Sequence, residues 1–171
     1  EQLAQDPSRL KLGGEMRGVT LLFADVRGFS RLSEGMDAES LIRFVNRLFT
    51  PLSETILAHR GTIDKFMGDA VMAFWNAPVA DPEHAAAACR AALAMQSEVG
   101  RLNREDAARR AAAGEPHTPV RIGIGLNTGQ CCVGNVGSPE RFDYSVLGDA
   151  VNVAARIESA TARYGVPILA G

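Results

Sequence analysis

The chain has 171 residues, of which 46% are hydrophobic, and it carries 18 Lys and Arg against 20 Asp and Glu. This composition is typical of one soluble globular domain, and a net charge of -2 provides no cationic surface of the kind that binds nucleic acid or anionic lipid. No apolar run approaches the roughly 18 residues of a membrane helix, and three cysteines, an odd number, do not indicate a disulfide framework. We therefore expect a cytoplasmic domain without direct membrane contact.

The first half of the chain predicts a strand, a helix and a hairpin. Residues 1–14 are charged and glycine-containing, as in a linker from an upstream domain. Residues 19–24 form an apolar, partly β-branched run that predicts a buried strand. Helical spacing of apolar residues follows Asp37, an N-cap residue, and Pro51 should kink or split that helix. Residues 62–75 then read as a β-hairpin.

The hairpin has Gly68-Asp69 as its two-residue loop, in the order that suits a type II′ turn. An alanine-rich helix is expected over residues 85–102, followed by a flexible, charged connection over residues 104–119. Residues 120–126 and 131–136 predict two strands that pair as a second hairpin.

A strand over residues 143–147, a helix over residues 149–164 and the start of a strand at residues 167–170 complete the chain. The order strand, helix, hairpin, helix, strand is that of an α+β, ferredoxin-like split βαβ core, with a mostly antiparallel sheet and packed helices on one face. In that topology the third strand lies between the first and the second. Asp25 and Asp69 should therefore meet.

Two carboxylates that meet raise each other's pKa unless a cation lies between them. Their oxygens suit Mg²⁺ or Mn²⁺, and no His or Cys stands at the spacing of a zinc site. The alternative is that Asp25 and Asp69 only occupy turns, a common use of aspartate, and spacing alone does not decide between the two.

Residues 26–30 form a glycine-containing loop whose N–H groups could face a phosphate, and a metal beside such a loop implies a nucleoside triphosphate. The glycines of residues 123–129 do not fit a dinucleotide fingerprint and are expected to let a helix approach the sheet. Asn152 and Arg156 are four residues apart and project from one helix face, where they could hold a sugar and a phosphate, or simply face solvent.

Three segments in order resemble the class III nucleotidyl cyclases, which include adenylyl and guanylyl cyclases. They are Phe23-Ala24-Asp25-Val26-Arg27-Gly28-Phe29-Ser30, Asp64-Lys65-Phe66-Met67-Gly68-Asp69-Ala70 and Tyr144-Ser145-Val146-Leu147-Gly148-Asp149-Ala150-Val151-Asn152-Val153-Ala154-Ala155-Arg156. The resemblance covers residues 15–171.

The resemblance implies a homodimer with two shared active sites and a reaction that converts ATP to 3′,5′-cyclic AMP and pyrophosphate. The positions that match metal-binding residues for two divalent cations, Mg²⁺ or Mn²⁺, are Asp25, Val26 and Asp69. Lys65 and Ser145 match the pair that reads the purine, while Gly28 and Phe29 of the glycine-containing loop and, separately, Arg141 are the candidates for contacts with the phosphates. The resemblance also implies that Asn152 orients the ribose and that Arg156 stabilises the transition state.

Two side chains favour adenine over guanine as the base. Lys65 can donate to N1 of adenine and a hydroxyl at Ser145 can accept from the exocyclic amine, whereas guanine presents an N1–H that Lys cannot accept. Guanylyl members have Glu and Cys there, so ATP is favoured. A guanylyl cyclase and a non-catalytic nucleotide-binding or dimerisation module remain the alternatives; a diguanylate cyclase lacks its signature at the hairpin.

The family usually continues past this point with a hairpin that carries a phosphate-binding Lys, so we expect residues 15–171 to be a catalytic domain truncated before that hairpin. Parent proteins of this kind are often anchored in the plasma membrane with sensor or regulatory domains upstream, which fits the linker-like start.

Overall fold

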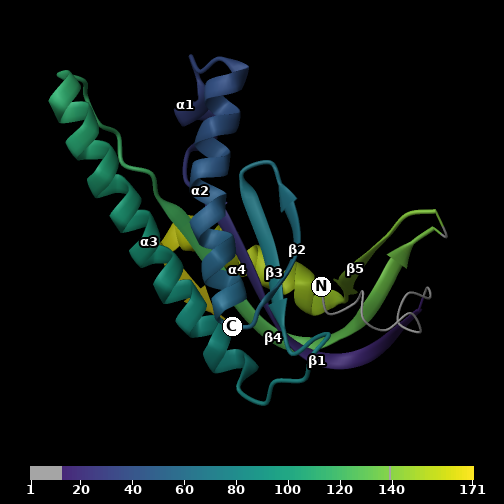
Figure 1. Ribbon diagram of the computed structural model, residues 1–171. Coiled ribbons are helices and arrows are strands. Elements are labelled where there is room, and N and C mark those ends of the chain that lie inside the picture. Colours follow the sequence, from purple (N-terminus) through teal and green to yellow (C-terminus); the bar gives the residue numbers. More distant parts are fainter. Residues whose placement is uncertain (1–12, 139) are drawn as a thin grey trace.

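The structure of the protein is a computed structural model, and it describes residues 13–138 and 140–171 (Figure 1). Its elements are, in order, β1 (Gly13–Val26), α1 (Phe29–Ser33), α2 (Ala38–Ala58), β2 (Thr62–Met67), β3 (Ala70–Trp75), α3 (His84–Ala113), β4 (Ile122–Gly137), β5 (Phe142–Leu147), α4 (Asp149–Tyr164) and β6 (Ile168–Ala170).

The strands form one six-stranded sheet in the order β2-β3-β1-β4-β5, with β6 added beside β4. All pairings are antiparallel except that of β4 with β6. Strand β3 lies between β1 and β2, as the split βαβ topology predicts, and Asp25 pairs with Ala70. The α+β, ferredoxin-like prediction is confirmed.

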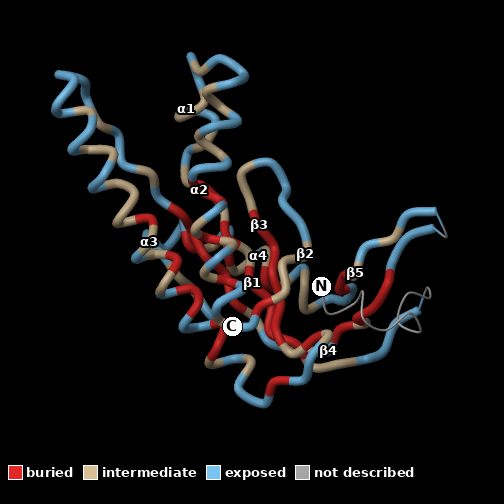
Figure 2. The backbone as a smooth tube through the Cα atoms, in the orientation of Figure 1, coloured by how far each residue is buried: buried red, intermediate tan, exposed pale blue. Residues whose placement is uncertain are grey.

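Two hydrophobic clusters cover opposite faces of the sheet, because successive side chains of a strand point to opposite sides. Leu22, Ala24 and Val26 of β1 face α2 and α3, which pack on the face expected for the core helices (Figures 1 and 2). Val19 and Leu21 face the other way, and Ala154 of α4 packs with them. The two helices of the split βαβ core therefore share one face, as expected. Helix α4, which comes after that core in the sequence, lies on the opposite face.

Strand β4 is continuous over 16 residues, so the predicted hairpin between residues 120–126 and 131–136 is wrong. Its long partner β1 explains the difference, since the register runs without interruption from Gly13↔Asn135 to Val26↔Ile122. The hairpin partner of β4 is β5, which pairs with residues 132–137. We call this hairpin, residues 132–137 with β5, the arm; it extends away from the helices in Figure 1.

The arm curls over the face that carries α4. Val133 and Val146 of the arm share a buried cluster with Met72 and Phe74 of β3, and the Tyr144 and Phe74 rings lie 6.1 Å apart. This curl brings β5 into contact with β2, although the two strands lie at opposite edges of the path β2-β3-β1-β4-β5. The arm contact matters for the site described below.

Two helices differ from their predicted extents. Helix α2 passes through Pro51 as one 21-residue helix, so it is not split, and buried Leu48, Leu52 and Ile56 stabilise it against the core. Helix α3 continues to Ala113, so the flexible connection predicted over residues 104–119 is wrong as far as residue 113.

Ion pairs explain the longer α3. Arg101 pairs with Glu98 and Glu105, and Asp106 pairs with Arg110 at helical spacing. Arg47 of α2 also reaches Asp106, at 2.9 Å. Charged residues that read as a loop in the sequence thus support one another on a helix.

The expected linker, residues 1–14, lies for the most part outside the described residues, and Gly13 and Gly14 begin β1. Within residues 13–138 and 140–171 no helix combines the length and the apolar character needed to cross a membrane.

Candidate active site

Asp25 and Asp69 meet, as predicted. Asp25 is the second-last residue of β1, and Asp69 stands in the two-residue loop between β2 and β3, where Gly68 adopts a φ of 63° that favours glycine. The Val26 N–H donates to the Asp69 carbonyl oxygen at 3.3 Å, which joins the two segments. Burial, followed by the Asp69 charge, raises the pKa of Asp25 to about 6.

This pair fits a divalent cation. Two carboxylates that raise each other's pKa gain from a positive ion between them, and oxygen ligands suit Mg²⁺ or Mn²⁺. The part of the chain that the structure describes has no group of three or more His, Cys, Asp or Glu side chains placed to hold a metal. Mg²⁺ commonly takes one or two carboxylates and completes its shell with substrate phosphates and water. Val26 has a buried side chain, so only its backbone could contribute.

The sequence did not identify Glu158, which lies beside this pair. Glu158 of α4 is buried, its charge also raises the pKa of Asp25, and its Oε1 lies 3.8 Å from Arg27 Nη2. Helix α4 comes this close because Gly125 leaves no room for a Cβ against the Glu158 backbone, as expected for that glycine run. The sequence signal for Glu158 was its helical spacing from Ala154 and Thr161, which places a glutamate on the buried stripe of α4.

The candidate phosphate loop is only partly free to bind an anion. The N–H groups of Val26 and Arg27 already donate to the carbonyl oxygens of Asp69 and Arg121. Gly28 has a φ of 66° and precedes α1, whose first N–H groups have no partner within the helix. The ring of Phe29 lies 6.4 Å from that of Phe44, so Phe29 also packs against α2.

Lys65 and Ser145 come together through a residue that the sequence did not single out. The Ser145 hydroxyl donates to Asp64 Oδ2 at 2.9 Å, and Lys65 Nζ lies 3.6 Å from Asp64 Oδ1. The Asp64 side chain is fully buried, whereas that of Lys65 is 50% exposed. Aspartate is uncommon inside strands, which was the only sequence signal for it.

Asn152 and Arg156 lie on the exposed side of α4, one turn apart, as their spacing predicts. Arg156 Nη2 lies 3.9 Å from Asp149 Oδ1, and both side chains are largely exposed. Glu158, two residues later and about 200° further round the helix, is the residue that faces Asp25. Within one chain, then, Arg156 points away from the carboxylate pair.

Arg141 is not brought to the other candidate residues. It lies in the turn between β4 and β5, where its N–H donates to the Ser138 carbonyl oxygen at 3.2 Å. Asp25 pairs with Gly123 at one end of β4, and Arg141 follows the other end.

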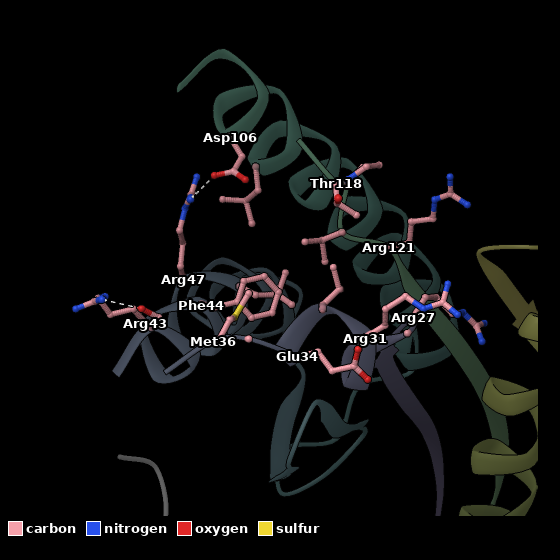
Figure 3. Close-up of a pocket in the computed structure, with 18 of the residues that line it drawn as sticks. Arg27, Arg31, Glu34, Met36, Arg43, Phe44, Arg47, Asp106, Thr118 and Arg121 are labelled. Atoms are coloured by element: carbon pink, nitrogen blue, oxygen red, sulfur yellow. Dashed lines mark hydrogen bonds and ion pairs between the residues drawn. The ribbon is translucent and has the colours of Figure 1, made fainter. Parts of the chain in front are cut away.

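A large hollow lies elsewhere. A pocket of about 1480 Å³ opens between α1, the start of α2 and the far end of α3, and Arg47 reaches across it to Asp106 (Figure 3). Of the candidate site residues only Gly28 lines it. The carboxylate pair, the Lys65 and Ser145 pair and the α4 residues lie outside this pocket.

Comparison with known proteins identifies the family of this fold. The adenylate and guanylate cyclase catalytic domain family matches residues 14–168. Adenylate cyclase 1 of Rhizobium meliloti strain 1021 is 45% identical over 152 residues, which are 89% of this chain but only 22% of that protein.

Two solved structures are equally similar in shape. The adenylyl cyclase CyaB from P. aeruginosa is 38% identical with a TM-score of 0.78, over 87% of this chain and 74% of that one. The guanylyl cyclase Cya2 is 37% identical with a TM-score of 0.78, over 86% and 72%. The fold alone therefore does not discriminate between the two bases. The chain belongs to the adenylate and guanylate cyclase catalytic domain family.

Proposed function

We propose that this domain converts ATP to 3′,5′-cyclic AMP and pyrophosphate. The observation that supports ATP is the juxtaposition of Lys65 and Ser145 on Asp64. The Lys65 ammonium is a donor for adenine N1, and the Ser145 oxygen accepts from the exocyclic amine. Guanine would present an N1–H to a cation that cannot accept it.

The remaining residues act on the sugar and the phosphates. Asn152 orients the ribose, and the Arg156 guanidinium balances negative charge that develops on the α-phosphate in the transition state. The free N–H groups around Gly28 and Phe29 bind phosphate oxygens. Arg141 contacts phosphate only if the arm reaches a partner subunit.

Asp25, Asp69 and the Val26 backbone hold the divalent cations, Mg²⁺ or Mn²⁺. When bound, these supply Lewis-acid activation of the ribose 3′-hydroxyl and neutralise charge at the α-phosphate. The contribution of the protein is to keep both carboxylates together, at a cost that the raised pKa of Asp25 records.

A head-to-tail homodimer would complete each site. Arg156 points away from the carboxylate pair of its own chain, so the Arg156 guanidinium that acts beside Asp25 would come from a second subunit. Met67 at the hairpin and Val136 and Leu147 on the arm are exposed apolar side chains around the same surface, as at a subunit contact. Dimerisation thus brings Asp25 of one subunit to Arg156 of the other.

The decisive experiment is to incubate the protein with ATP or GTP and Mn²⁺ and to identify the cyclic product by mass spectrometry. Cyclic AMP supports the proposal. Cyclic GMP from GTP as the preferred product supports the alternative, a guanylyl cyclase, which the equal similarity to Cya2 keeps open. Nucleotide binding without any cyclic product would indicate a non-catalytic module.

The metal pair has its own test. Mn²⁺ with nucleotide should raise the melting temperature, because a ligand that binds the folded state stabilises it. Replacing both carboxylates, Asp25→Asn with Asp69→Asn, should abolish that increase. An undiminished increase in the double variant would place the metals elsewhere.

A further inference from the structure

We infer that Asp64 sets the direction of the Ser145 hydrogen bond and so makes the serine an acceptor that selects a purine with an amino group at C6. Asp64 is a positioning residue, since it acts on the base only through Ser145. The inference rests on the proposed use of Lys65 and Ser145 for base recognition, and it adds the reason why a hydroxyl, which could donate or accept, does only one of these.

A β-bulge places Asp64 where it can do this. Ile63 pairs with Ala73 and Lys65 pairs with Met72, so Asp64 is the extra residue of β2 that faces no partner on β3. Ala73 belongs to the cluster under α2 and α3, and Met72 to the cluster under the arm. The bulge therefore turns β2 from one face to the other at Asp64, toward the arm that carries Ser145.

The hydrogen bond has a defined direction. An ionised carboxylate is only an acceptor, and a hydroxyl has one proton, which Ser145 donates to Asp64 Oδ2 at 2.9 Å. The remaining capacity of the Ser145 oxygen is two lone pairs. Ser145 is 5% exposed, so it opens to a ligand over a small area and can offer it only an acceptor. An amine at C6 satisfies that acceptor, and a carbonyl oxygen at C6 does not.

The Lys65 charge favours the ionised form of Asp64. Lys65 Nζ lies 3.6 Å from Oδ1, which has no hydrogen-bond partner among residues 13–138 and 140–171, so the ammonium is the group that balances this charge. Burial raises the pKa of Asp64, and the Ser145 hydrogen bond and the Lys65 charge oppose that rise. Asp143 of β5 adds a repulsive charge and lies two residues before Ser145 on the same strand, which makes it a suitable control position.

Purine riboside triphosphate is the sharpest probe, because it keeps the N1 acceptor of ATP and lacks only the amine at C6. Any contribution of Lys65 through N1 then cancels in the ratio of the two nucleotides. We expect the parent protein to favour ATP by about tenfold, the effect of one hydrogen bond to a neutral group. The ratio is measured both as kcat/KM and as the affinity in a fluorescent-nucleotide displacement assay with Mn²⁺.

Three variants locate the effect. Asp64→Asn keeps the shape of the side chain, and its amide oxygen should turn to Lys65 and its NH₂ to Ser145, which would make the serine a donor toward the base. We expect the preference for ATP to fall to near unity in this variant and in Ser145→Ala. Asp143→Asn, which removes an equal charge from the same region, should keep the parent ratio.

An Asp64→Asn protein that retains the parent ratio overturns the inference, and so does a parent protein with no preference between the two nucleotides. Thermal melting checks that each variant is folded; if Asp64→Asn does not fold, Asp64→Ala, which also removes the acceptor, takes its place with the same expected loss. Failure of the proposed function is seen separately, as preferred formation of cyclic GMP by the parent protein.

Discussion

The two halves of the candidate site are built in different ways. Asp25 and Asp69 stand at the ends of neighbouring strands and are held together although the Asp69 charge raises the cost of ionising Asp25. Lys65 and Ser145 stand on strands at opposite edges of the main sheet path, and Asp64 joins them through a hydrogen bond and an ion pair. The metal end thus brings two like charges together, whereas the base end is joined by a hydrogen bond and by opposite charges.

This difference indicates where ligand binding is coupled to stability. A cation at the metal end relieves repulsion between carboxylates and should stabilise the fold directly. At the base end a hydrogen bond and an ion pair already hold the side chains in place, so the nucleotide finds a preorganised surface and gains little by ordering it. The metal end should therefore govern activity and metal-dependent melting, and the base end should govern selectivity.

The largest expected effect comes from substituting Asp25 and Arg156 on different subunits. Asp25→Asn and Arg156→Ala should each reduce activity on the order of 10²–10³-fold, as for the loss of one group that stabilises transition-state charge. In a mixed dimer, one shared site would collect both substitutions and the other would be intact. Mixing the two inactive variants should recover up to about a quarter of the parent activity, since random exchange makes half of the dimers mixed.

The recovery should increase with protein concentration, and labelled subunits show whether exchange has taken place. Two preparations of the Asp25→Asn protein, mixed in the same way, are the matched control and should stay inactive. If exchanged mixtures of the two different variants also stay inactive, Asp25 and Arg156 act within one subunit, and the shared-site arrangement is wrong.

The next effect concerns the base end alone. Lys65→Glu with Ser145→Cys should shift the ratio of kcat/KM for ATP over GTP by about 10- to 100-fold toward GTP, because Glu accepts from guanine N1–H and no longer donates to adenine. Asn152→Ala serves as the control, since loss of a ribose contact should lower both nucleotides alike. An unchanged ratio in the double variant would remove Lys65 and Ser145 from base recognition.

A smaller effect tests whether the arm holds the base end in place. Val133→Ala removes a buried side chain from the cluster between the arm and β3, and it should lower the free energy of unfolding by about 2 kcal/mol. Val99→Ala removes the same atoms from the cluster on the other face. In urea titrations the two should be similarly destabilised, but only Val133→Ala should reduce the preference for ATP. Equal preferences would show that the base end does not depend on the curl.

The smallest effect is a pH dependence at the metal end. The pKa of Asp25 is raised from 3.8 to about 6, so the folded protein binds this proton more tightly than the unfolded chain. Metal-free protein should therefore gain stability as the pH falls from about 7 toward 5, and lose it as the pH rises through the folded pKa. Mn²⁺ binding needs the carboxylate, so its stabilising effect should shrink below about pH 6. Melting curves of Asp25→Asn should lack both trends; if they persist there, another group causes them.

Much of the fold was predictable because it follows from local periodicity. The hairpin at Gly68-Asp69, the strand before Asp25 and the helix that carries Asn152 and Arg156 each depend on residues close in the sequence. The split βαβ order then placed Asp25 beside Asp69, since only neighbouring strands are needed for that contact. The errors arose where distant partners decide the outcome.

Strand β4 illustrates the reason. Residues 127–130 contain glycine and polar side chains and read as a turn, but pairing with β1 keeps them extended. Likewise, α3 extends beyond residue 104 because its charges pair along the helix and with Arg47. Local propensity is a weak preference, and tertiary hydrogen bonds and ion pairs outweighed it here.

The sequence by itself determined the topology, the carboxylate pair and the family resemblance, which all depend on short segments in a given order. Only the tertiary structure decided how the base end is built. The curl of the arm over β3 is stabilised by packing between Val133, Val146 and Phe74, residues far apart in the chain, and β2 carries a bulge at Asp64. Such packing depends on the shape of the assembled sheet, and no spacing along the sequence encodes the contact of Asp64 with Ser145.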